Sequence, residues 1–270
     1  MRRMRNLAVF SLALLLCPGP LTAPAQAPVE HRQAYLALIY YVRSVDTDKF
    51  VRSNRQYSSA LASHAVSGAL LRWIAYADDT AHTYLWLYPI EHLNDIEELS
   101  NAESQLDERI RAEGWNAGSD LHHVVDHTEE FVIRDEPSLS RLPSDAEAWT
   151  HQNCEFQLYY TFGGYGGSDS EVRGLWREYL SAFPRKASSS YYRILRVLIG
   201  LERPLWVVQH CGASWQEIKD QQSQEAKLTG TIGAETQHKF LKLVRKTEVW
   251  RYQFDAGMSY PLTSSSQPAR

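Results

Sequence analysis

The 270-residue sequence has few cysteines and, after its first segment, no long hydrophobic run. Of its three cysteines, Cys17 lies in that first segment, so the rest of the chain holds only Cys154 and Cys211. A membrane-spanning helix needs about 20 consecutive apolar residues, and no later stretch reaches that length. We therefore expect no membrane span, and the two remaining cysteines are worth testing as a pair.

The sequence also lacks an excess of positive charge. Its formal net charge is −4, and loss of the first segment (1–25) would remove three arginines and no acid, which lowers the charge to about −7. Nucleic acids and anionic membranes bind through clustered positive charge. Neither is expected as a partner.

Signatures of nucleophilic and phosphate chemistry are missing as well. We find no GxSxG motif, no Lys-Ser/Thr of a P-loop, no HExxH pair and no cysteine set up as a catalytic residue. No catalytic residue is therefore assigned from the sequence.

The first residues have the three parts of a signal peptide. Arg2, Arg3 and Arg5 are basic, residues 7–16 are apolar, and Ala23-Pro24-Ala25 offers a cleavage site. Ten apolar residues are too few to span a bilayer. We predict a cleaved signal peptide (1–25) and a soluble protein of the periplasm or extracellular space, where a disulfide is permitted.

The rest of the chain contains an internal repeat. Three aromatic and β-branched segments recur at a spacing of 121 residues, which places Arg72 on Arg193, and a fourth recurs with a slip of one or two residues. The matched segments are 35–42 and 156–163, 70–76 and 191–197, 83–90 and 204–211, and 129–140 and 248–259. We predict copy one at 33–140, a linker at 141–153, copy two at 154–260 and a flexible tail at 261–270.

Each copy reads as strand, helix, strand, strand, helix, strand. The last strands of the two copies end in similar segments, which begin at Asp135 in copy one and at Asp255 in copy two. This order, written twice, resembles the ferredoxin-like superfamily of dimeric α/β barrels. Its members include stress-responsive barrel proteins, NIPSNAP-like proteins, antibiotic-biosynthesis-type monooxygenases and chlorite-dismutase-like haem proteins. The resemblance implies an α+β fold in which two ferredoxin-like βαββαβ repeats of one chain close an intramolecular barrel. Because one chain would supply both barrel halves, the resemblance is compatible with a monomer, and the sequence does not decide the oligomeric state.

The resemblance also implies a disulfide. In this fold the first and third strands of a copy are antiparallel neighbours, and Cys154 begins the first strand of copy two while Cys211 ends its third. A Cys154–Cys211 bond would stabilise the fold mainly through the unfolded state. The alternative is two separate thiols.

Aromatic, arginine and histidine side chains are the candidates for a ligand cavity between a sheet and its helices. Tyr84, Trp86 and Tyr88 share one face of a strand because strand residues alternate. The full candidate set is Arg72, Tyr84, Trp86, Tyr88, Arg193, Trp206 and His210. The alternative is that the aromatics are core, the arginines pair with acids, and the histidine ends a strand.

A histidine cluster at 120–131 is the one candidate metal site. Apolar residues around it follow a helical period, and a helix would place His123 and His127 on one face, close enough to chelate a divalent ion. In a strand the same residues would lie about 13 Å apart, too far to share an ion. The alternative is the solvated face of an amphipathic helix.

We predict a small-molecule-binding protein whose ligand lies in a sheet–helix cavity. One alternative is an enzyme of the same superfamily, either a cofactor-poor monooxygenase or a haem-dependent oxidoreductase, for which His210, His238 and His151 are available histidines. Another is a non-catalytic structural or interaction module with a solid barrel. The residues do not decide whether haem, a divalent metal or no cofactor is bound, because one fold hosts many functions.

Overall fold

The computed structural model describes residues 33–63, 72–112, 123–163, 167–184 and 190–260. The predicted signal peptide, the predicted tail and His122, another histidine of the cluster at 120–131, lie outside these ranges. The elements are, in order, β1 (Ala34–Val42), the 3-10 helix η1 (Ser44–Asp46), α1 (Thr47–Ser63), β2 (Ile74–Asp78), β3 (Thr83–Ile90), α2 (Asp95–Ala112), β4 (Val125–Asp135), η2 (Pro137–Leu139), α4 (Ala146–Thr150), β5 (Asn153–Thr161), α5 (Gly167–Ser181), β6 (Arg193–Ile199), β7 (Leu205–Gly212), α6 (Trp215–Leu241) and β8 (Val244–Phe254). Within the described ranges, none of the helices has both the length and the apolar character to span a membrane.

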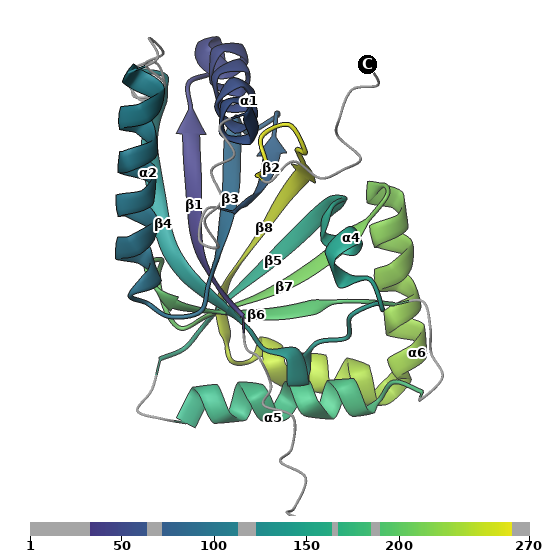
Figure 1. Ribbon diagram of the computed structural model, residues 1–270. Coiled ribbons are helices and arrows are strands. Elements are labelled where there is room, and N and C mark those ends of the chain that lie inside the picture. The colour runs from purple at the N-terminus through teal and green to yellow at the C-terminus, as the bar shows by residue number, and fades with distance from the viewer. Residues whose placement is uncertain (1–32, 64–71, 113–122, 164–166, 185–189, 261–270) are drawn as a thin grey trace, which may run out of the picture. The chain divides into compact units, whose positions relative to one another are not determined.

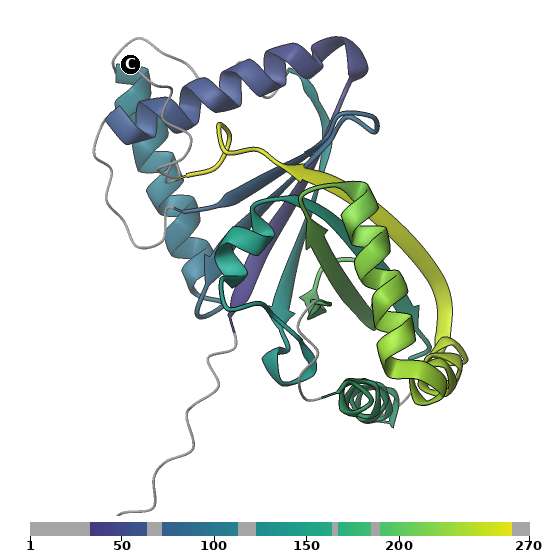
Figure 2. The same ribbon diagram turned by 90° about the vertical axis from the view of Figure 1, so that its right-hand side faces the viewer.

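The strands form one closed antiparallel barrel. Their order around it is β1-β3-β2-β8-β5-β7-β6-β4, so the strands of copy one make sheet one and those of copy two make sheet two. Helices α1 and α2 cover the outside of sheet one, and α5 and α6 cover the outside of sheet two (Figures 1 and 2). This arrangement confirms the predicted α+β barrel built from two βαββαβ repeats.

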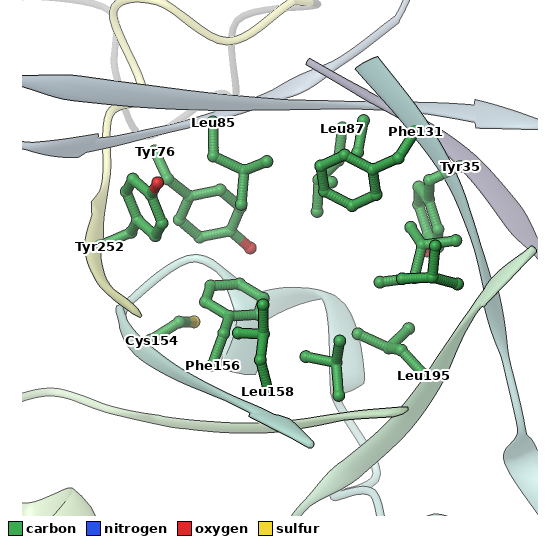
Figure 3. Close-up of a cluster of buried hydrophobic side chains, with 14 of the residues drawn as sticks. Tyr35, Tyr76, Leu85, Leu87, Phe131, Cys154, Phe156, Leu158, Leu195 and Tyr252 are labelled. Carbon is green, nitrogen blue, oxygen red and sulfur yellow. The ribbon is translucent and has the colours of Figure 1, made fainter. Parts of the chain in front are cut away.

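Inward-pointing side chains fill the barrel. On β1, Tyr35 and Ile39 point inward whereas Leu36 packs under the helices, so the strand is apolar on both faces. Figure 3 shows the inward cluster, in which Phe131 and Phe156 come from opposite sheets. The remaining void is about 20 Å³, which holds little more than one water molecule. The barrel interior is therefore core and not a ligand site.

The structure corrects the predicted spacing of the repeat. A β-bulge lies at the same point of both copies, after Tyr41 in β1 and after Tyr160 in β5, so β5 follows β1 by 119 residues. Strand β6 keeps this spacing after β2. Arg193 therefore corresponds to Ile74, and the predicted match of Arg193 with Arg72 was wrong.

Strands β3 and β7 are 122 residues apart. Leu36 pairs with Tyr88 in copy one, and Glu155 pairs with His210 in copy two. The predicted spacing of 121 would have matched His210 with Pro89, on the opposite face of the sheet, because a slip of one residue exchanges the faces. His210 instead takes the place of Tyr88 and faces the helices.

The stretch with the histidine cluster is a strand. β4 begins at Val125 and pairs with β1 along almost its whole length. The helix predicted there was wrong, and the corresponding strand of copy two, β8, begins at Val244. The first residues of both strands are largely exposed on both faces, so their polar side chains do not alternate with apolar ones and hide the period of a strand.

Cys154 and Cys211 form the predicted disulfide. They face each other across the β5–β7 pair with Cα atoms 4.2 Å apart, and both are fully buried. The antiparallel pairing of the first and third strands, on which the prediction depended, is confirmed.

Candidate functional site

A cavity of about 270 Å³ lies between sheet two and its two helices. We call it the copy-two cavity. Its strand wall is formed by Gln157, Tyr159, Val208 and His210, and its helix wall includes Trp176, Tyr179, Glu225 and Phe240. Of the residues predicted to line a cavity, only His210 contributes to this one.

Glu225 holds one nitrogen of His210. The Glu225 Oε2 atom lies 3.2 Å from His210 Nε2, and His210 is 4% exposed. Glu225 also accepts hydrogen bonds from the hydroxyl groups of Tyr179 (2.9 Å) and Ser190 (3.5 Å). Because Glu225 accepts from these two hydroxyl groups, we assign its contact with His210 as a hydrogen bond in which Nε2 is the donor.

The other nitrogen of His210, Nδ1, is buried and has no hydrogen-bond partner among the described residues. The indole nitrogen of Trp176, on the facing wall, is likewise buried without a partner there. Buried polar atoms without partners are rare and often belong to functional groups. With the proton on Nε2, Nδ1 is an acceptor that no described group satisfies.

A chain of hydrogen bonds runs along β5 beside the cavity. Tyr159 donates to Gln157 (2.7 Å), and Gln157 donates to Glu155 (2.9 Å). Gln222 and Arg251 also donate to Glu155, each at 2.9 Å. Burial acts to raise the pKa of Glu155, but these three donors outweigh it and the pKa is lowered. Glu155 is therefore an ionised and fully paired group.

The phenol groups around the cavity keep their protons at neutral pH. Burial raises the pKa of Tyr159 to about 12, and the charges of Glu225 and Glu155 add to the effect. Burial and then Glu225 raise the pKa of Tyr179 and of Tyr192 in the same way. These side chains are hydrogen-bond donors and not anions.

A break in α6 forms part of the helix wall. The helix bends at Gly230, whose φ of 55° and ψ of −140° favour glycine. A Cβ atom at Gly233 would come within 2.1 Å of the Thr229 hydroxyl oxygen, so this position also needs glycine. The Thr229 hydroxyl donates to the Glu225 carbonyl at 2.9 Å, which satisfies a carbonyl close to the break.

Three of the predicted cavity residues lie in an aromatic core of copy one. Tyr84, Trp86 and Tyr88 project from β3 toward α1 and α2 and are buried. Trp86 stacks on Trp73 with ring centroids 5.5 Å apart, and Tyr84 lies 4.6 Å from Phe50. This core occupies the place in copy one that the cavity occupies in copy two.

The predicted arginines line a different hollow, of about 750 Å³, at the end of the barrel beside α4. Arg193 donates to the Tyr35 hydroxyl (2.7 Å) and forms an ion pair with Asp135. Arg72 lies on the rim of the same hollow. The structure therefore brings Arg72 and Arg193 together, but not with His210.

Trp206 packs on the helix-facing side of β7 and is fully buried. The guanidinium groups of Arg173 and Arg196 lie 5.2 and 5.8 Å from its ring, in cation–π contact. These contacts explain Trp206 as a packing residue.

The geometry predicted for a metal pair at His123 and His127 is absent, because the two residues are not on a helix. His123 precedes β4, and His127 lies within it. His127 Nδ1 lies 2.8 Å from Asp126 Oδ2, and its ring stacks on Tyr41 at 4.1 Å. Across the described ranges, no group of three or more His, Cys, Asp or Glu side chains could hold a metal ion.

The copy-two cavity does not fit haem. Among the described residues that line it there is no lysine or arginine to pair with the two propionate groups. Its volume of about 270 Å³ is also at the lower limit of sites for drug-sized ligands. We therefore derive no chemistry from haem at His210.

Solved structures share this architecture. A candidate monooxygenase from Lactobacillus acidophilus NCFM matches with a TM-score of 0.50 and 9% identity, over 82% of this chain and 93% of that chain. An anthrone oxidase-like protein matches with a TM-score of 0.54 and 12% identity, over 84% and 92%. A candidate monooxygenase from Fusobacterium nucleatum gives 0.52 and 7%, over 83% and 93%. The chain has the dimeric α/β-barrel fold.

Identities of 7 to 12% show the fold alone. No known family profile matches the chain. No curated protein matches it either. What the cavity does must therefore be argued from its own residues.

The sequence reasoning named His210 and missed its partner Glu225. Glu225 follows Glu103 by 122 residues, the same spacing that relates His210 to Tyr88. A spacing of 122 would have aligned both the helix glutamates and the strand residues that they contact, so the pair could have been predicted from the sequence. The spacing of 121 does not align them.

Proposed function

We propose that the copy-two cavity binds a small aromatic molecule that carries a hydroxyl or amine group. The observation that carries this proposal is the His210–Glu225 pair, which leaves an acceptor nitrogen at a buried wall. The rings of Trp176 and Phe240 supply apolar surface for an aromatic ligand. A lining with glutamate and, among its described residues, without lysine or arginine disfavours anions.

A second candidate function is the oxidation of such a molecule by dioxygen, which accepts the electrons that the ring loses. The likeness in fold to candidate monooxygenases and to an anthrone oxidase-like protein favours it. His210 Nδ1 would accept the proton of the bound hydroxyl, and Glu225 would stabilise the resulting imidazolium. Removal of that proton makes an aromatic ring electron-rich and therefore easier to oxidise.

Titration calorimetry with phenol and anisole tests the binding function, since the two are similar in shape but only phenol has a donor. We expect phenol to bind at least about fivefold more tightly, because leaving a buried acceptor unpaired costs about 1–3 kcal/mol. His210→Leu should remove the difference. Tyr88→Phe, at the matching place in copy one, should preserve it. Equal affinities for wild-type protein would contradict the proposal.

Oxygen consumption in the presence of anthrone, whose tautomer anthrol carries the hydroxyl group, tests the second function. We expect a rate above the uncatalysed one that is lost in His210→Leu and retained in Tyr88→Phe. A rate no higher than the uncatalysed one, together with phenol binding, would leave binding as the function. Binding of neither phenol nor anthrone would favour a non-catalytic interaction module.

We also propose that the protein is exported and works as a monomer. The predicted signal peptide and a disulfide, which persists in non-reducing compartments, support export. The presence of both barrel halves in one chain supports a monomer. N-terminal sequencing of the protein recovered from cells tests cleavage after Ala25, and light scattering of the purified protein tests its mass.

A further inference from the structure

The Cys154–Cys211 disulfide lies directly beside two polar groups of the copy-two site. In the β5–β7 ladder, Cys154 pairs with Cys211 and the next residues, Glu155 and His210, pair with each other. The cysteines point into the barrel, where Figure 3 shows Cys154 at the edge of the inward cluster, whereas Glu155 and His210 face the helices. One covalent bond thus joins the two strands next to the site histidine.

The end of β7 has a single neighbouring strand. The pairing of β6 with β7 extends only as far as Gln209, so His210, Cys211 and Gly212 pair with β5 alone. Backbone at the end of a strand with one partner is the kind that opens at low free-energy cost. Trp149 adds one contact, a hydrogen bond of 2.9 Å from its indole nitrogen to the Cys211 carbonyl.

Copy one holds the same strand end by packing. The pairing of β2 with β3 ends one residue before Tyr88, so Tyr88 also has a single neighbouring strand. Tyr88 is 1% exposed, and its ring lies 5.5 Å from Trp73 and 6.2 Å from Trp86. Tyr35 and Pro89 take the positions of the two cysteines. Aromatic contacts therefore hold this strand end in copy one, which has no disulfide at the matching positions.

We propose that the Cys154–Cys211 disulfide is the positioning element of the copy-two cavity, because it gives the strand end at His210 the support that aromatic packing gives Tyr88. A cavity beside His210 removes packing partners. A covalent bond one residue away restrains the strand without filling the cavity. The ligand part of this inference rests on the proposed function, whereas the part about the strand does not.

Reduction should therefore loosen the site. A dithiol such as dithiothreitol exchanges the S–S bond for two thiols, passing two electrons and two protons to the cysteines and becoming a cyclic disulfide itself. The β5–β7 pair then loses its covalent link beside His210 and keeps only non-covalent contacts there, among them the hydrogen bond from Trp149.

Hydrogen exchange of the mature chain, read by mass spectrometry, tests the proposal on wild-type protein and on the double variant Cys154→Val/Cys211→Val. Valine keeps apolar volume in the barrel and removes only the cross-link. We expect residues 210–212 to exchange at least tenfold faster in the variant, and residues 88 and 90 of copy one to be unchanged. Phenol affinity should fall at least threefold, and reoxidation of reduced wild-type protein should restore it.

Equal acceleration in both copies would overturn the proposal, because the disulfide would then be a general stabiliser. Unchanged exchange at 210–212 would overturn it as well. If neither the wild-type protein nor the valine variant binds phenol, but exchange at 210–212 still differs between them, the proposed function fails and the positioning role stands. If the valine variant does not fold, pulsed exchange immediately after reduction of wild-type protein makes the same comparison.

Discussion

Copy one and copy two share one pair of groups, a glutamate of the second helix and the residue of the third strand that contacts it. In copy one Tyr88 donates a hydrogen bond to Glu103, and in copy two His210 contacts Glu225. The two glutamates occupy matching places, since their spacing equals that of the strands. The duplicated chain therefore has the acid twice and a different partner for it in each copy.

The surroundings of this pair differ in volume and polarity. Trp86 and Leu38 of copy one are replaced by Val208 and Gln157 in copy two. An indole and a leucine fill the space under the helices with apolar atoms, whereas valine leaves room and glutamine offers hydrogen bonds. The comparison teaches that a cavity can arise in this fold from a loss of side-chain volume, without any change of architecture.

The largest predicted effect is on the filled copy. Trp86→Ala should lower the free energy of unfolding by about 3–5 kcal/mol, because it deletes a buried ring from a packed core. Val208→Ala, at the matching position beside the cavity, should cost only about 1.5 kcal/mol for two methyl groups. Urea unfolding of both variants measures the difference. Equal costs would show that the two copies are packed alike.

A smaller effect concerns the acid of copy one. Burial raises the pKa of Glu103 from its ordinary 4.5 to about 6. Because the folded-state pKa is the higher one, the stability from this group is fully present below pH 4.5 and is lost as the pH rises through 6. The loss is about 2 kcal/mol.

Glu103→Gln should remove this dependence and be more stable than wild-type protein at pH 7.5 by about 2 kcal/mol, with little difference at pH 4. Urea unfolding at both pH values measures it. The exposed Glu98→Gln on the same helix is the control, and its effect should differ between the two pH values by no more than about 1 kcal/mol, the contribution of an acid in the first turn of a helix. If the stability difference between Glu103→Gln and wild-type protein does not vary with pH, the pKa of Glu103 is not raised by burial.

The smallest effect on stability is expected in the hollow copy. Val208→Phe should fill part of the copy-two cavity and change the free energy of unfolding by less than about 1 kcal/mol, because space is available for the ring. Phenol affinity should fall at least tenfold, as measured by calorimetry. Unchanged phenol binding in a folded Val208→Phe variant would move the ligand site away from this cavity.

Much of the fold could be predicted because the strands carry a strong signal. Segments such as 35–42 are apolar on both faces, which only a strand covered on both sides needs, and their recurrence indicated the duplication. The disulfide followed from the position of Cys154 and Cys211 at the ends of adjacent strands, once the resemblance supplied the adjacency.

The candidate site was harder to predict because it depends on the register of strands. A shift of one residue between β3 and β7 decides whether His210 faces the helices or the barrel interior. The β4 stretch misled for a related reason. The polar residues that follow Val125 are largely exposed on both faces of the sheet, so local periodicity says little there.

By itself, the sequence determined the duplicated βαββαβ order, the apolar strands and the pair of cysteines, because these follow from the local pattern of side chains along the chain. Only the tertiary structure decided that copy one is filled and copy two is hollow, and that Glu225 meets His210. Those outcomes depend on which side chains of distant segments share one space. Pairing register and side-chain volume set that, and neither is written in any one segment.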